Sequence, residues 1–562
     1  MGLRAKKLRA LVLAAWAAAG AATATATATA GAAPAAQARA DSLLVTTDRG
    51  VVRGAAGPGV REFKGIPFAV PPLGERRFAS PESSPPWKGV LDASRYRSAC
   101  PQVSRYGLTD ASDDEDCLYL NVTVPSPGTA SGGASVAAAA KKRPVIVWVH
   151  GGAYVGGSSN LYPLDYFSRT GDVVVVSINY RLGVFGFMAH PALPAAHNGT
   201  LGLEDQREAL RWVKRNIAAF GGDPANVTFA GESAGAASVC MQLIAPEQSR
   251  GLFQKAIIQS IACGVRLESV ANASRIGIEV GKLVHCENPA AAIACLRSKS
   301  IHELLDAQGA VGAANPRAFA PSIGSLSVPR QGADAFASGR FLRVPMINGG
   351  NRDEMRLYVA YAIQAGQAVN NETYPKLLAS IYGDAAADVL AQYPLSQFPS
   401  APSALGTVES DFMSGGALTN CLYLKIAEDA SRYVPVYEYE FADRRAPPEM
   451  DDPGFEMGAV HAAELPYFFP HISHNSKING PDLEPASQTL SAAMVAYWSS
   501  FAHTGRPAPA GLPEWPRYRA PGDVMRFEPG AMRAFDAAAA HHCGFWARHY
   551  PADLSAHAAG SP

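Results

Sequence analysis

The sequence predicts an α/β protein built on a central, mostly parallel sheet with helices on both faces. Two apolar, β-branched runs, PVIVWVH at 144–150 and VVVVSINY at 173–180, are typical of strands buried in parallel sheets. After the second run, residues 202–220 carry an apolar stripe at helical spacing, made by Leu203, Leu210, Val213, Ile217 and Phe220. This alternation of strand and helix indicates crossover helices between parallel strands.

Further strands are expected at 226–233 (NVTFAGES), 256–260 (AIIQS) and 344–349 (VPMING). The low-complexity segment 126–142 is typical of a surface loop between strands. The length of 562 residues would by itself suggest three to four domains at ~150 residues each. Because no repeat and no convincing linker divides the chain, we expect one domain over residues 41–562.

The composition excludes several classes of protein. The chain has 49 Lys and Arg against 49 Asp and Glu, so it lacks the basic excess that nucleic acid or an anionic membrane surface attracts. Hydrophobic residues make up 48% and charged residues 17%, and the mean hydropathy is −0.01. A chain of this composition folds around a core and is not disordered as a whole.

Residues 1–40 have the layout of a secretory signal peptide. Four positive side chains precede an apolar run at 11–19: Arg4, Lys6, Lys7 and Arg9. Small residues then offer cleavage sites between about 22 and 40. A membrane anchor is the alternative, but threonines interrupt the only candidate stretch, which should hold ~20 apolar residues. We therefore expect a secreted or periplasmic protein without a stable membrane anchor.

An exported chain can form disulfides, and this one has eight cysteines. Spacing alone does not fix their pairing. Two pairs could close short loops, Cys100 with Cys117 and Cys286 with Cys295, while Cys421 and Cys543 would need the fold to bring them together. Cys240 and Cys263 lie in apolar surroundings that would suit buried thiols, but their state does not follow from the sequence. The cluster at 541–543, His-His-Cys, suggests zinc but lacks a CxxC or HxxxH partner.

The motif Gly-Glu-Ser-Ala-Gly at 231–235 indicates a catalytic nucleophile. It follows an expected strand and precedes an expected helix, the context in which G-x-S-x-G forms a sharp turn that exposes the serine hydroxyl. Upstream, His150, Gly151, Gly152 and Ala153 directly follow another strand. A Gly-rich turn at this place supplies backbone N–H groups for an oxyanion hole. Ser233 is therefore the candidate nucleophile.

Long, separated segments of the chain resemble the type-B carboxylesterase family, the cholinesterase-like branch of the α/β-hydrolases. FGGDPANVTFAGESAG (220–235) resembles the serine signature of that family, and EDCLYLNVTVP (115–125) its second signature. FKGIPFAVPPLGERRF (63–78) and WPRY (515–518) extend the similarity over nearly the whole mature chain. The resemblance implies an α/β-hydrolase fold with long surface insertions, and the disulfides Cys100–Cys117, Cys286–Cys295 and Cys421–Cys543.

The resemblance also places the partners of Ser233. GGNRDEM (349–355) resembles the acid motif of the family, which makes Glu354 the candidate triad acid and Asp353 the alternative. GAVHAAELPYFF (458–469) resembles the histidine motif, which makes His461 the base. The order Ser, acid, His is that of the α/β-hydrolases. Glu464, three residues after His461, could suggest a metal pair, but no third ligand is apparent. The oxyanion donors implied are Gly152, Ala153 and Ala234.

Some positions depart from the family pattern. Ala153 stands where many relatives have a third glycine, and Met355 and Ala462 stand where glycine is common. Phe229 replaces a usual aliphatic residue. The loop between Cys100 and Cys117 contains no tryptophan to bind a quaternary ammonium, which argues against choline esters.

The sequence thus indicates a serine ester hydrolase that acts on a small-molecule ester and needs no cofactor or metal. The alternatives are a lipase for longer acyl chains and a non-catalytic adhesion protein on the same fold. The three candidate triad residues disfavour the second alternative, because relatives without activity typically lose the nucleophile. The acyl group, the alcohol group and the oligomeric state do not follow from the sequence.

Overall fold

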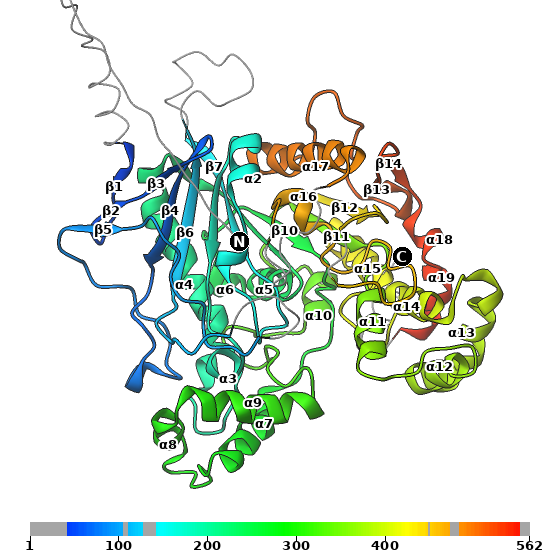
Figure 1. Ribbon diagram of the computed structural model, residues 1–562, viewed down its shortest axis with the longest axis horizontal. Helices are drawn as coiled ribbons and strands as arrows, with labels where there is room; N and C mark the ends of the chain where they lie inside the picture. Colours follow the sequence, from blue (N-terminus) through cyan, green and yellow to red (C-terminus); the bar gives the residue numbers. More distant parts are fainter. Residues whose placement is uncertain (1–41, 105–110, 127–141, 448–449, 473–482, 551–562) are drawn as a thin grey trace, which may run out of the picture. The chain divides into compact units, whose positions relative to one another are not determined.

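The computed structural model describes residues 42–104, 111–126, 142–447, 450–472 and 483–550. The expected signal peptide lies outside the described residues. The main sheet has eleven strands in the order β14-β13-β12-β11-β10-β9-β7-β8-β6-β4-β3 (Figure 1). The strands from β8 to β13 in this order run parallel to one another, and antiparallel strands lie at both edges.

The expected strands are present at the centre of this sheet. They are β7 (Arg143–Val149), β8 (Val174–Ile178), β9 (Gly222–Glu232), β10 (Lys255–Gln259) and β11 (Met346–Asn351). On the parallel side the sheet continues through β12 (Val436–Phe441) and β13 (Val524–Phe527) to β14 (Arg533–Phe535). On the other side it ends in β6 (Tyr119–Pro125), β4 (Val60–Pro67) and β3 (Ala55–Gly57). A small second sheet joins β1 (Leu44–Thr46), β2 (Val51–Arg53) and β5 (Val90–Asp92).

Alternate side chains of the central strands enter two hydrophobic cores, one on each face of the sheet. Val145, Val147 and Val149 of β7 pack into the core that contains α4 (Leu201–Asn216) and α5 (Ala234–Leu243). Ile146 and Trp148 point to the opposite face. That face is covered by α2 (Asp165–Gly171), α16 (Leu465–Phe468) and α17 (Pro485–Thr504), which Figure 1 shows away from α4 and α5. The predicted arrangement of helices on both faces is therefore confirmed.

Two long insertions separate the parallel strands. Between β10 and β11 lie α7 (Val270–Leu283), α8 (Ala292–Ser298), α9 (Ile301–Ala314) and α10 (Gly332–Ala337). Between β11 and β12 lie α11 (Arg356–Gln364), α12 (Tyr374–Tyr382), α13 (Ala386–Gln392), α14 (Ala401–Asp411) and α15 (Asn420–Ser431). The remaining short helices include α3 (Gly183–Phe187), α6 (Pro246–Ser249), α18 (Ala537–Ala540) and α19 (Cys543–Trp546). No helix among the described residues is long and apolar enough to cross a membrane.

All eight cysteines form disulfides. Three bonds have the pairing that the resemblance implied, Cys100–Cys117, Cys286–Cys295 and Cys421–Cys543.

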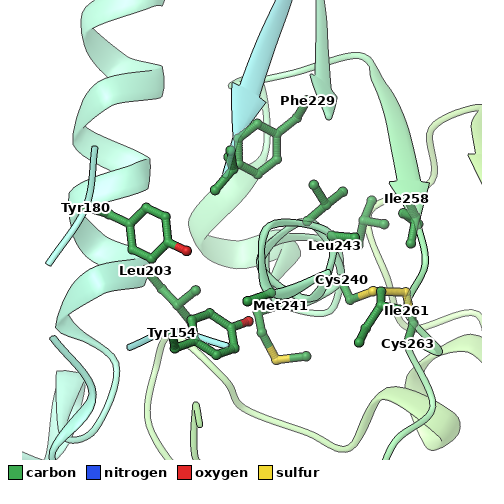
Figure 2. Close-up of a cluster of buried hydrophobic side chains, with 14 of the residues drawn as sticks. Tyr154, Tyr180, Leu203, Phe229, Cys240, Met241, Leu243, Ile258, Ile261 and Cys263 are labelled. Atoms are coloured by element: carbon green, nitrogen blue, oxygen red, sulfur yellow. A yellow bond between two sulfur atoms is a disulfide. The ribbon is translucent and has the colours of Figure 1, made fainter. Parts of the chain in front are cut away.

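The fourth bond joins Cys240 and Cys263, whose state the sequence left open between buried thiols and a disulfide. Both residues are buried as expected, but their Cα atoms lie 5.4 Å apart and their sulfurs are bonded. Cys240 is on α5, which follows β9, and Cys263 follows β10, which pairs with β9. Figure 2 shows this bond beside Leu243 and Ile261. The pairing of β9 with β10 brings the two cysteines together, and this proximity could not be deduced from a separation of 23 residues.

Candidate active site

The candidate site residues gather where the parallel strands end. The Gly-rich turn 150–153 follows β7, Ser233 follows β9, and Glu354 follows β11. His461 lies in the segment between β12 and α16. Because parallel strands end at the same edge of a sheet, side chains far apart in sequence meet there, as is usual for ligand sites in α/β folds.

Ser233 occupies a strained turn between β9 and α5, with φ 54° and ψ −124°. Its backbone N–H donates to the carbonyl of Gln259 at 2.9 Å. A Cβ atom on Gly235 would lie 2.0 Å from the carbonyl oxygen of Val149, and one on Gly231 would lie 2.5 Å from the carbonyl carbon of Gly235. The two glycines of the motif are therefore needed for the close approach of the turn to its neighbours.

Ser233, His461 and Glu354 form one hydrogen-bonded line. The Nε2 atom of His461 lies 2.9 Å from Ser233 Oγ, and its Nδ1 atom lies 2.7 Å from Glu354 Oε2. Both His461 and Glu354 are buried. The other carboxylate oxygen of Glu354 accepts hydrogen bonds from the backbone N–H of Asn351 and the hydroxyl of Tyr423. Glu354 is thus fixed on both oxygens, which also fixes the imidazole against it.

Asp353 belongs to a different cluster. Its carboxylate lies 3.3 Å from Arg356 and 3.3 Å from Arg444, and it accepts a hydrogen bond from the backbone N–H of Ala459. Of these two neighbouring acids, it is Glu354 whose carboxylate lies within hydrogen-bond distance of His461 among the described contacts.

Glu232 is a residue of this site that the sequence reasoning did not select. Its Oε1 atom lies 3.2 Å from His461 Nε2, and its side chain is buried. It is the second residue of the G-x-S-x-G motif and the last residue of β9. An acid between small residues at the end of a buried strand could have indicated its role, since buried carboxylates are found beside a partner.

Glu464 is a buried acid close enough to Glu354 to interact with it electrostatically. It accepts hydrogen bonds from the side chains of Asn351, at 2.6 Å, and Gln259, at 3.1 Å. Burial, together with the charge of Glu354, raises the pKa of Glu464. These amide partners account for both of its oxygens.

The described residues contain no group of three or more His, Cys, Asp or Glu side chains arranged to hold a metal ion. In the His-His-Cys cluster at 541–543, Cys543 forms a disulfide and His541 bonds Asp411 and Glu440.

The Gly-rich turn after β7 adopts backbone conformations that bring it against Ser233. Gly152 has φ 106° and Ala153 has φ 53°. A Cβ on Gly152 would lie 2.2 Å from the carbonyl oxygen of Gly156, so only glycine fits there. Preceding them, His150 stacks on Tyr180 and contacts the carbonyl of Gly151 through Nδ1 at 2.8 Å. Burial lowers the pKa of His150 to about 4, so this imidazole is neutral. Its contact with the carbonyl of Gly151 helps to fix the conformation of the turn.

A cavity of about 90 Å³ opens over Ser233 and His461. Gly152 and Ala153 line one side of it. The remaining wall is mainly apolar and aromatic and comprises Leu161, Tyr162, Leu357, Tyr358, Tyr361 and Ala462. Glu232 is the acid of the lining. The cavity therefore has the candidate nucleophile Ser233 at its base and mainly apolar side chains around it.

The strand order and the strained serine turn define the protein as an α/β-hydrolase. The model of the carboxylesterase family matches residues 41–546. The chain is 35% identical to an acetylcholinesterase of Bungarus fasciatus, covering 92% of this chain and 88% of the relative. It is 34% identical to a para-nitrobenzyl esterase of Bacillus subtilis (strain 168), with 84% and 92% covered. A solved thermophilic PNB esterase superposes with a TM-score of 0.71 at 30% identity, over 89% of this chain and 99% of that one. The chain belongs to the carboxylesterase family and is a carboxylic ester hydrolase.

Proposed function

We propose that this carboxylesterase cleaves esters through an acyl-enzyme on Ser233, with His461 as general base and acid and Glu354 as the triad acid. The observation that carries the proposal is the line of two hydrogen bonds from Ser233 Oγ through His461 to Glu354. A serine hydroxyl is a weak nucleophile unless an adjacent base removes its proton, and the base needs a partner that fixes its tautomer.

In the first step, Nε2 of His461 takes the proton of Ser233 as Oγ attacks the ester carbonyl carbon. The Nδ1–H of His461 donates to Glu354, whose negative charge stabilises the imidazolium that forms. When the tetrahedral intermediate collapses, the bond to the alcohol oxygen breaks and His461 gives its proton to that oxygen. Water then attacks the acyl-enzyme with His461 as base, which releases the carboxylic acid and restores Ser233.

The oxyanion is proposed to bind the backbone N–H groups of Gly152, Ala153 and Ala234. Gly152 and Ala153 line the cavity over Ser233, and Ala234 is the first residue of α5, where the helix dipole is positive. Removing one such donor costs roughly 3–4 kcal/mol in transition-state stabilisation. Glu232 adds a second carboxylate close to Nε2 of His461, where it stabilises the cationic form of the ring.

We further infer that the substrates are uncharged esters with apolar groups of modest size. The apolar and aromatic wall of the cavity favours such groups, and its small volume disfavours long acyl chains. The relatives include an acetylcholinesterase and a para-nitrobenzyl esterase. The absence of tryptophan from the segment 101–116 favours an uncharged ester over a choline ester as the substrate. The four disulfides support action outside the cytoplasm.

The test is the paired behaviour of the wild-type protein and Ser233→Ala. The wild type should hydrolyse p-nitrophenyl acetate and be labelled by a fluorophosphonate probe, and the variant should do neither while keeping its circular dichroism spectrum. A panel of p-nitrophenyl esters from acetate to palmitate, below and above their solubility limits, separates esterase from lipase. More than a few per cent of activity in Ser233→Ala would contradict the assignment, and a wild type that remains unlabelled would indicate a non-catalytic protein.

A further inference from the structure

The described residues hold a second, larger cavity, of about 500 Å³, far from the candidate active site. Its lining is basic: four of its nine residues are arginines, Arg250, Arg330, Arg340 and Arg343, and Glu247 is the acid among them. The chain as a whole carries equal numbers of acidic and basic residues. This cavity, called here the arginine pocket, is thus a local concentration of positive charge in a protein with no overall excess.

The arginine pocket lies at the N-terminal ends of the parallel strands, whereas Ser233 lies at their C-terminal ends. Arg250 follows α6 and precedes β10, and residues 339–343 lead into β11. The strands β10 and β11 are parallel, so both segments lie where the strands begin, whereas Glu354 lies just after β11 ends. Six strand residues span roughly 20 Å. The pocket therefore does not form part of the ester-binding cavity.

Two of the arginines, Arg330 and Arg343, are held in place by contacts within the protein. Arg330 donates to the carbonyls of Ile244 and Arg340 and to the carboxylate of Glu247, at 2.8, 3.2 and 3.1 Å. Arg343 donates to the carbonyl of Gly339 and lies 5.0 Å from the centroid of the Tyr433 ring.

The loop that carries Arg340 and Arg343 is itself held in one conformation. Gly339 has φ 68°, and a Cβ there would lie 2.5 Å from the Tyr433 ring. The backbone N–H of Leu342 donates to the carbonyl of Leu243, at the end of α5. These contacts hold the pocket open without a ligand, so that little ordering cost would remain for binding.

The other two arginines of the pocket, Arg250 and Arg340, are exposed, as Arg343 also is. Arg340 uses its Nε–H on Ser338 Oγ, and the described residues provide no side-chain hydrogen bond to the guanidinium of Arg250. Guanidinium groups pair with phosphate and sulfate oxygens through two parallel hydrogen bonds. The solvent-facing N–H groups of Arg250 and Arg340 could donate hydrogen bonds to such an anion.

We propose that the arginine pocket binds a small polyanion that carries two or more phosphate or sulfate groups. The lining carries one carboxylate, Glu247, which forms an ion pair with Arg330, against four arginines, so positive charge is in excess. A volume of about 500 Å³ is that of a site for a small organic molecule and exceeds what one phosphate group fills. The shared chemistry covers two sources, a free or organic polyphosphate and a sulfated sugar.

Calorimetric titration of the purified protein with sodium triphosphate and, separately, with a fully sulfated heparin disaccharide tests the proposal in a phosphate-free buffer. At least one probe should give a saturable 1:1 isotherm whose affinity falls as NaCl is added. Arg250→Gln/Arg340→Gln should weaken that binding at least tenfold and leave hydrolysis of p-nitrophenyl acetate unchanged. The matched control is Arg275→Gln/Arg519→Gln, two exposed arginines outside the pocket, which should bind as wild type does.

The pattern of binding distinguishes the sources, since triphosphate alone indicates a polyphosphate and the disaccharide alone a sulfated sugar. Absence of saturable binding by both probes would overturn the proposal. So would equal weakening by the control pair, because this result would reduce the interaction to general surface charge.

Discussion

Asp353 and Glu354 are neighbours in the chain, yet their carboxylates enter separate networks. The carboxylate of Glu354 lies 2.7 Å from Nδ1 of His461, whereas Asp353 pairs with Arg356 and Arg444. The turn that follows β11 thus directs two adjacent acids to different places. Glu354 lies beside the imidazole, and Asp353 lies in a cluster of ion pairs.

This separation leads to opposite expectations for two conservative variants. Glu354→Gln should lower kcat by several orders of magnitude with little change in stability, since losing the acid of a comparable triad costs about 10⁴ in kcat. Asp353→Asn should lower the unfolding temperature, because it leaves Arg356 buried with a weaker partner, and change kcat by at most a modest factor. Kinetics on one soluble ester and thermal unfolding of both variants check this. A dead Asp353→Asn enzyme that folds normally would require the triad to be redrawn.

The closeness of Glu232 to His461 gives a second expectation. Glu232→Gln keeps the size of the side chain but removes a negative charge 3.2 Å from Nε2. Because that charge stabilises the imidazolium of the transition state, kcat should fall about tenfold or more, equivalent to about 1.4 kcal/mol. Stopped-flow acylation by p-nitrophenyl acetate measures this step directly. An unchanged acylation rate would limit Glu232 to a structural role.

The serine turn should not tolerate a methyl group at Gly235. In Gly235→Ala the new Cβ would meet the carbonyl oxygen of Val149 at 2.0 Å, and backbone cannot move aside cheaply. We expect loss of labelling by the fluorophosphonate probe and a lower unfolding temperature. The control is Gly309→Ala, on the exposed side of α9 with no atom near its Cβ, which should stabilise the helix by about 0.5–1 kcal/mol. A fully active Gly235→Ala enzyme would contradict the proposed need for this close approach.

The disulfide Cys240–Cys263 should stabilise the fold. It closes a separation of 23 residues that includes the end of α5 and all of β10. In the chain-entropy account such a loop contributes about 3 kcal/mol. Cys240→Ala/Cys263→Ala should therefore lower the urea midpoint. Cys286→Ala/Cys295→Ala, which opens a separation of only 9 residues in an insertion, should lower it less. The reverse order of the two effects would contradict this ranking.

The buried ion cluster at His541 should make stability depend on pH. Burial alone would lower the pKa of His541, but the carboxylates of Asp411 and Glu440 outweigh it and raise this pKa to about 10. The ordinary value of ~6.5 applies to the unfolded chain. The stabilisation from the charged ring is therefore complete below pH ~6.5 and is lost as pH rises toward about 10.

Urea unfolding of the wild type and His541→Gln at pH 6, 8 and 10 checks this pH dependence. The difference in unfolding free energy should be about 3–5 kcal/mol at pH 6 and should shrink as pH rises. The exposed His302, 3.8 Å from Asp113, provides the control His302→Gln, which should behave as wild type at every pH. A difference between the wild type and His541→Gln that does not change with pH would show that His541 is not the titrating group.

The strands β7, β8 and β10 could be predicted because apolar, mostly β-branched side chains fill their buried faces. β12 was missed because its sequence, VYEYEF, contains Glu438 and Glu440, which suggest exposure. Both are buried, and partners compensate them: Asn348 donates to Glu438, and Arg526 and His541 bond Glu440. Such compensation comes from segments far away in sequence and leaves no local pattern.

The end of β11 was missed for a related reason. Gly349 and Gly350 suggest a turn, and the strand was expected to end at residue 349. They instead pair with Tyr439 and Glu440 of β12 as far as Asn351, because the partner strand supplies hydrogen bonds along this length. The candidate residues Ser233, Glu354 and His461 could be proposed because each lies in a short local segment that resembles a motif of the family. The position of Glu232 beside His461 and the bond between Cys240 and Cys263 depend instead on how β9 and its neighbours pack.

The proposed catalytic triad joins Ser233 to His461, 228 residues later, and His461 to Glu354, 107 residues earlier. We therefore expect enzymatic activity to appear late in folding. Helices form from local contacts, but Ser233 and His461 meet only after strands from both halves of the chain have paired, and such long-range closure is slow. During refolding from urea with the disulfides intact, recovery of esterase activity should therefore lag behind recovery of helical ellipticity. A polypeptide ending before residue 461 would carry the nucleophile and the acid and still be inert.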